Sequence, residues 1–158
     1  GEFSLFAQHL DRAEDRAGLA RLNAEACAYA PSQTRLDEAT RQGAAFARTA
    51  NAVWGLDLPD VVLSLAVGAA ACAQDMDAGD VAALYLSAFL SNLIAAAQRL
   101  MPLGQTDGQR ILAALQPLAL DIAATTRNVS LDDIQSTAFV SDIAAMRQDT
   151  LEPRLFQS

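Results

Sequence analysis

Apolar residues recur at intervals of three and four along most of the chain, which is the spacing of one face of an α-helix. The clearest example lies within residues 36–54. Its apolar positions are Leu36, Ala39, Gly43, Phe46, Ala47, Ala50, Val53 and Trp54, and the opposite face carries Asp37, Glu38, Arg41, Arg48 and Asn51. Gly55 follows and can take the left-handed conformation that ends many helices. The pattern therefore predicts one long amphipathic helix that Gly55 closes.

The same spacing predicts helices along the rest of the chain. Two precede the first example, over residues 3–13 and 19–29, and Pro31 ends the second of them. Further helices are expected over residues 57–74, 80–101 and 106–127, followed by a short one from Ser130 and a last one over 139–146. Neither a strand pattern nor a repeat interrupts the series. We expect an all-α fold, a single-domain helical bundle of about six or seven helices that comprises residues 1–158.

Two of these helices, over residues 57–74 and 80–101, are almost entirely apolar. Asp57 is a candidate N-cap for the helix over 57–74, because a carboxylate there accepts backbone N–H groups. Residues 80–101 are hydrophobic all round except for Asn92 and a few hydroxyl groups. All-round apolarity predicts a helix at the centre of the bundle, with Asn92 as a hydrogen-bonded core amide. Its polar residues favour a buried helix over a membrane span.

The connection at residues 102–109 combines a helix break with a new helix start. Thr106 and Gln109 have the spacing of a capping box, so we expect the next helix to begin here. Its predicted buried face is Ile111, Leu115, Leu118 and Ile122. Pro117 is expected to kink it. Gly104 and Gly108 either let the turn pack closely against a neighbouring helix or mark an interface, and the sequence leaves both open.

The charge pattern excludes two classes of partner. The net charge is −8, and all 11 basic residues are arginines scattered without a basic patch. No nucleic acid is therefore expected as a partner, and no membrane, since an acidic surface repels anionic lipid. Cys27 and Cys72 lie in apolar surroundings without CxxC spacing, which indicates buried free thiols and a reducing, cytoplasmic location.

Residues that carry chemistry are few. His9 is the only histidine, so neither a metal site nor a histidine-assisted nucleophile is expected, and no catalytic residue is assigned. The paired carboxylates at 57/60, 75/77 and 132/133 all fall at predicted helix starts, where capping explains them. An all-α hydrolase is therefore disfavoured. The alternative function is binding of an apolar small molecule in a cavity formed by Trp54, Phe89, Leu93 and Met101.

Three segments resemble the UreF family of urease accessory proteins over essentially the whole chain. The first is the helix with Ala88-Phe89-Leu90-Ser91-Asn92-Leu93, which leads into Pro102-Leu103-Gly104-Gln105-Thr106-Asp107-Gly108-Gln109. The second is the ending Asp142-Ile143-Ala144-Ala145-Met146-Arg147 with Arg154-Leu155-Phe156, and Glu38-Ala39-Thr40-Arg41-Gln42-Gly43 is a weaker third. Gly1-Glu2-Phe3 resembles a cloning junction. We interpret the chain as an expressed fragment, the C-terminal two thirds of a family member without its N-terminal segment.

The resemblance implies a urease accessory protein that is not itself an enzyme. It implies a homodimer that joins a UreD/UreH-type protein and recruits the GTPase UreG into the complex that inserts nickel into apo-urease, possessing no cofactor because its partners handle nickel and GTP. On this basis we expect residues 148–158 to be a partner-binding tail. The candidate partner-binding residues are Arg147, Arg154, Leu155 and Phe156, and the candidates for a partner or dimer interface are Gly104, Gln105, Thr106, Gln109 and Arg110.

Overall fold

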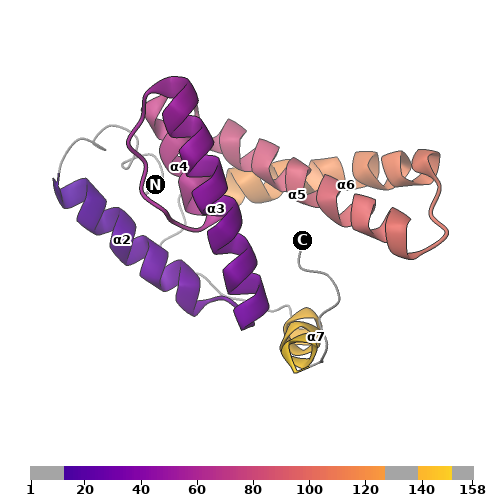
Figure 1. Ribbon diagram of the computed structural model, residues 1–158. Helices are drawn as coiled ribbons and strands as arrows, with labels where there is room; N and C mark the ends of the chain where they lie inside the picture. The colour runs from indigo at the N-terminus through magenta and orange to yellow at the C-terminus, as the bar shows by residue number, and fades with distance from the viewer. Residues whose placement is uncertain (1–12, 127–138, 151–158) are drawn as a thin grey trace.

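The chain is all-helical, as the sequence predicts. The computed structural model describes residues 13–126 and 139–150, and this part of the chain contains six helices and no strand. The helices are α2 (Ala13–Ala28), α3 (Gln33–Trp54), α4 (Leu63–Ala73), α5 (Ala78–Leu100), α6 (Gln105–Thr126) and α7 (Phe139–Asp149). Helices α3 and α4 pack together, and α2 lies beside them and adds Leu19 and Leu22 to the core. Helices α5 and α6 form a long antiparallel pair that extends away from them (Figure 1). The helices predicted over 3–13 and from Ser130 lie largely or wholly outside the described residues.

The hydrophobic core lies between α2, α3 and α4. Leu19 and Leu22 come from α2, Ala47 and Ala50 from α3, and Leu65 from α4, and all five side chains are buried. Most α3 and α4 core positions are alanine or glycine, so these two helices approach each other closely. Gly43, Ala47 and Ala50 confirm the middle of the predicted inward face of α3, whereas Val53 and Trp54 at its end are exposed.

Both ends of α3 are capped, and the cap at Gly55 is the one that the sequence predicts. The Ser32 hydroxyl accepts a hydrogen bond from the Arg35 amide at 3.3 Å. At the other end, Gly55 takes a left-handed conformation with φ of 67°, and its N–H donates to the Asn51 carbonyl. A residue with a Cβ atom is disfavoured in that conformation.

The segment before α4 differs from the prediction. Asp57 does not cap a helix, since α4 begins only at Leu63 and residues 55–62 are not helical. Side-chain amides of neighbouring helices bind this backbone instead: Asn51 bonds both the N–H and the carbonyl of Leu58, and Asn23 accepts from the Val62 amide. Burial of Leu58, Val61 and Val62 adds to these bonds, and together they outweigh the local helix signal. The Asp57 carboxylate pairs with Arg16 on α2.

Gly43 allows the segment that precedes α4 to lie directly on α3. A Cβ atom at Gly43 would stand 1.9 Å from the Val61 carbonyl oxygen and 2.7 Å from the Leu63 nitrogen. Both are backbone atoms, so they cannot turn aside as a side chain could. The glycine is therefore required by packing.

Helix α5 is not at the centre of a bundle, which corrects the prediction from its all-round apolarity. Ile94 is its only buried residue, and Asn92 is exposed rather than a core amide. The start of α5 agrees with expectation, since the Asp77 carboxylate accepts from the Gly79 and Asp80 amides. The long apolar helix is thus packed mainly against α6, with a smaller contact to α4.

The buried face of α6 also differs from the prediction. Its buried residues are Gly108, Ala119 and Ala123, whereas Ile111, Leu118 and Ile122 are exposed. Small residues let α6 approach α5 closely, and this leaves the larger apolar side chains on the flank of the pair. The Gln116 amide donates to the Ser87 hydroxyl at 2.7 Å across the same contact. The helix continues through Pro117.

Candidate protein-interaction surfaces

The motif at residues 102–109 forms the turn that joins α5 to α6. The Gln98 side-chain amide on α5 donates to Gln105 Oε1 at 2.8 Å and to the Gly104 carbonyl at 3.4 Å. Helix α6 begins at Gln105, and the Gly108 amide donates to the Gly104 carbonyl at 3.0 Å. Thr106 therefore lies inside the first turn of α6 and is not the N-cap of a capping box. Gln98, from the preceding helix, supplies the side-chain bonds to this turn.

The two glycines of the turn have different roles. A Cβ atom at Gly108 would stand 2.5 Å from Gln98 Nε2 and 2.9 Å from the Cγ2 of Ile94, so close packing of α5 and α6 requires a small residue there. At Gly104 the nearest atom is Asp107 Oδ2, at 3.8 Å. Packing thus explains Gly108 and leaves Gly104 unexplained.

The other candidate interface residues lie together on the surface of the tip of the α5–α6 pair. Gln105, Thr106, Gln109 and Arg110 are all exposed, and Arg110 pairs with Asp107 at 2.8 Å. This exposed ion pair adds little to stability. The tip presents these side chains to solvent at the end of the helical pair.

Replacing Gln105 with alanine separates an interface role from a structural one. The variant loses one exposed hydrogen bond, so we expect the free energy of unfolding to fall by no more than about 1 kcal/mol. If the tip contacts a partner protein, binding of that protein should weaken while thermal stability is nearly unchanged. Weaker binding that follows an equal loss of stability would indicate a purely structural role for the motif.

A row of apolar residues follows one face of α5, and Phe89, Leu93 and Leu100 within it are exposed. We call it the α5 seam, and it comprises Ala82, Leu86, Phe89, Leu93, Ala96 and Leu100. Successive members are four and three residues apart, which places them on one face of the helix. Leu100 is 85% exposed, and Phe89 and Leu93 are each about half exposed. This spacing can be read from the sequence, but it does not stand out there because α5 has apolar residues on every side.

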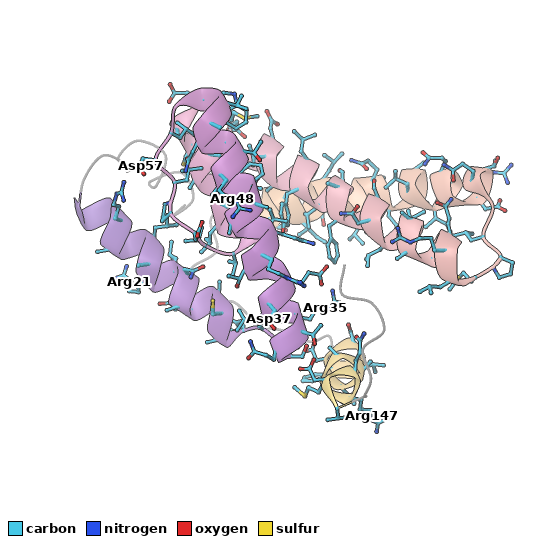
Figure 2. The ribbon with its side chains drawn as sticks, in the orientation of Figure 1. Arg21, Arg35, Asp37, Arg48, Asp57 and Arg147 are labelled. Atoms are coloured by element: carbon cyan, nitrogen blue, oxygen red, sulfur yellow. The ribbon has the colours of Figure 1, made fainter. Side chains whose placement is uncertain are left out.

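Helix α7 carries a second uncovered apolar face. Phe139, Val140, Ile143 and Met146 are all exposed, and Val140 is 84% exposed. Ala145 is the only buried residue of α7. Arg147 is exposed on the same helix (Figure 2). Arg154, Leu155 and Phe156 lie outside the described residues.

A small apolar hollow lies where α3, α4 and α5 meet. Its volume is about 160 Å³, and Phe46, Trp54, Leu84 and Tyr85 are among its lining residues. Burial raises the pKa of the Tyr85 phenol. Of the four side chains expected to form a ligand cavity, only Trp54 lines it, and ligand pockets are usually at least roughly 300 Å³. This hollow is therefore not the cavity predicted from Trp54, Phe89, Leu93 and Met101.

The cysteine prediction agrees with the structure for the part described. Neither cysteine is in a disulfide; Cys72 is buried as predicted, while Cys27 is only partly buried. Burial, and then the negative charge of Asp75, raise the pKa of the Cys72 thiol to about 11. The thiol therefore stays protonated at neutral pH and is a poor nucleophile.

The described residues contain no side-chain cluster suited to a metal ion, and one of their helices is apolar enough to cross a membrane. Within 13–126 and 139–150 no group of three or more His, Cys, Asp or Glu side chains could hold a metal ion, and His9 lies outside these ranges. In the same part of the chain, α5 is the one helix long and apolar enough to cross a membrane. Only 6% of its most apolar window is buried. Burial at the centre of a bundle, which the sequence predicted, therefore does not explain why α5 is so apolar.

These features define a class: an all-helical protein whose main surface features are exposed apolar helix faces and an exposed polar tip. Comparison with known proteins narrows the class to one family. The sequence profile of the UreF family matches residues 2–116, and the chain belongs to that family.

Several relatives support the assignment, and each is named urease accessory protein UreF. The relative from Cereibacter sphaeroides strain KD131 is 46% identical over 155 residues, which cover 98% of this chain and 72% of the relative. Those from Roseobacter denitrificans and Bradyrhizobium are 41% and 40% identical and cover 89% and 98% of this chain. The chain spans 63% of the first of these two and 69% of the second.

Proposed function

We propose that the chain is a non-catalytic scaffold of urease maturation. It joins a UreD/UreH-type protein and a UreG-type GTPase in the complex that inserts nickel into apo-urease, and it modulates the GTPase by contact. Nickel and GTP are handled by the partners. Family membership supports the link to urease, and the uncovered apolar faces support a role that depends on binding other proteins.

The observation that carries the proposal is the apolar surface of α5 and α7. Contiguous exposed apolar side chains are costly in water and mark binding sites when they gather on one face. In the α5 seam Phe89, Leu93 and Leu100 are exposed, and the four large apolar residues of the α7 face are exposed as well. Protein partners that cover them would also explain the composition of α5 without a membrane, in the cytoplasmic location proposed for the chain.

The α5 seam fits a helix of a second copy of the chain. Alternating spacings of four and three are those of a coiled-coil seam, where each apolar side chain packs between residues of the facing helix. In a two-fold dimer the same residues meet on both subunits. Antiparallel pairing of two α5 helices places Phe89 and Leu93 near the two-fold axis, since they lie at the middle of the seam. We therefore place the homodimer contact at the α5 seam.

In this arrangement the tip of the α5–α6 pair stays exposed and is available for a second contact. Gly104, Gln105, Thr106, Gln109 and Arg110 supply hydrogen-bonding and charged groups rather than apolar area. Such residues suit the polar rim of an interface, where they orient a partner. The proposal assigns the tip to a partner protein of the maturation complex.

The C-terminal residues Arg154, Leu155 and Phe156, together with Arg147 on α7, form the proposed contact with the UreD-type partner. Removing residues 151–158 should abolish co-purification with that partner, because it deletes apolar and cationic anchors of the kind that dominate interfaces. Changing Gln157 and Ser158 to alanine, in the same tail, should leave binding intact. Unchanged co-purification of the truncated chain would refute the tail's role.

A further inference from the structure

The start of α3 is bonded to the end of α7, although the two lie more than a hundred residues apart in sequence. The Gln33 amide donates to Asp149 Oδ2 at 2.8 Å, and the Thr34 amide donates to Asp149 Oδ1 at 3.3 Å. The Thr34 hydroxyl also donates to Asp149 Oδ1. In Figure 1, α7 accordingly lies beside the lower end of α3.

These bonds complete the cap of α3. The first backbone N–H groups of a helix have no acceptor within it. Ser32 takes only the Arg35 amide, which leaves the amides of Gln33 and Thr34 for Asp149. The carboxylate also stands at the positive end of the helix dipole, where a negative charge is favoured.

Little apolar packing holds α7 in this place. Ala145 is its one buried residue, and its larger apolar side chains are exposed. A helix with so few buried groups would be expected to leave its position easily. The hydrogen bonds from α3 to Asp149 are therefore a main attachment of α7.

We propose that Asp149 is a positioning residue that fixes α7 against α3, so that the α7 apolar face is presented to the UreD-type partner in one orientation. This inference rests on the proposed function. A surface fixed before binding loses less conformational entropy when the partner docks, and its affinity is higher for that reason. Asp149 acts through α7 and need not touch the partner.

The test combines amide hydrogen exchange with partner affinity in Asp149→Ala and Thr34→Ala variants. Asp149→Ala should raise the exchange rates of α7 amides at least about tenfold and weaken binding to the purified UreD-type protein by about the same factor. Thr34→Ala, which removes a donor on α3, should change both in the same direction by less. Gln148→Ala is the matched control, because Gln148 is the exposed neighbour on α7, and it should change neither.

The outcomes separate this inference from the proposed function. Unchanged exchange of α7 in Asp149→Ala would overturn it, as would weaker binding without faster exchange, which would mean that Asp149 contacts the partner directly. If the wild-type chain does not bind the UreD-type protein, the proposed function fails, while the exchange measurement still decides whether Asp149 holds α7.

Discussion

Replacing Gly43 with alanine should lower the free energy of unfolding by about 2 kcal/mol. The new Cβ atom would overlap the backbone of residues 61–63, with the closest approach 1.9 Å from the Val61 oxygen. Overpacking of this kind lowers the free energy of unfolding by about 3 kcal/mol. The better helix propensity of alanine offsets about 1 kcal/mol of this loss. For a chain of this length the melting temperature should fall by roughly 4–8 °C, which thermal unfolding followed by circular dichroism would measure.

Gly104→Ala is the matched control for this experiment. The nearest atom to a Cβ there is 3.8 Å away, so its stability should change by no more than about 0.5 kcal/mol. Equal melting temperatures for Gly43→Ala and the wild type would contradict the described contact between α3 and the segment before α4.

Replacing Leu93 with glutamate should prevent self-association through the α5 seam. Leu93 is about half exposed in the single chain, so the substitution costs the monomer little. In the proposed dimer two such charges would be buried near the two-fold axis without partners. Central interface residues contribute about 2–4 kcal/mol each, so we expect the dissociation constant to rise by about 30- to 1000-fold, measured by sedimentation equilibrium.

Ser91→Glu is the control, because Ser91 lies on the opposite side of α5 from the seam and is also exposed. It adds the same charge to the same helix and should leave self-association unchanged. Equal weakening by both variants would point to a general effect of charge, and no weakening by Leu93→Glu would place the dimer contact elsewhere.

Sequence patterns predicted the helices better than their positions in the fold. The amphipathic pattern of α3 is strong because its two faces differ in polarity. Its Gly55 cap and the middle of its inward face were predicted correctly, although Val53 and Trp54 are exposed. The pattern of α5 has no such contrast. All-round apolarity is shared by a central helix and by one that awaits a partner, so the prediction of a buried α5 and a core Asn92 was wrong.

Side-chain hydrogen bonds from neighbouring helices account for the other differences. Asn23 and Asn51 bind the backbone of the segment before α4, and the spacing of apolar residues does not reveal those bonds. Gln98, on the preceding helix, likewise donates a hydrogen bond to the Gly104 carbonyl in the turn. The contact between Asp149 and α3 was missed for the same reason. The candidate residues at the tip were found by family resemblance, and their role in binding stays a prediction.

The central claim is that this chain supports nickel insertion into urease by binding other proteins. The most direct test measures nickel per urease active site in cells that supply urease and all its accessory proteins except this one. The account predicts that wild-type chain raises nickel content and urease activity toward full occupancy, and that Leu93→Glu does not, although it folds equally well. Urease that carries the same nickel content with and without the chain would contradict the account.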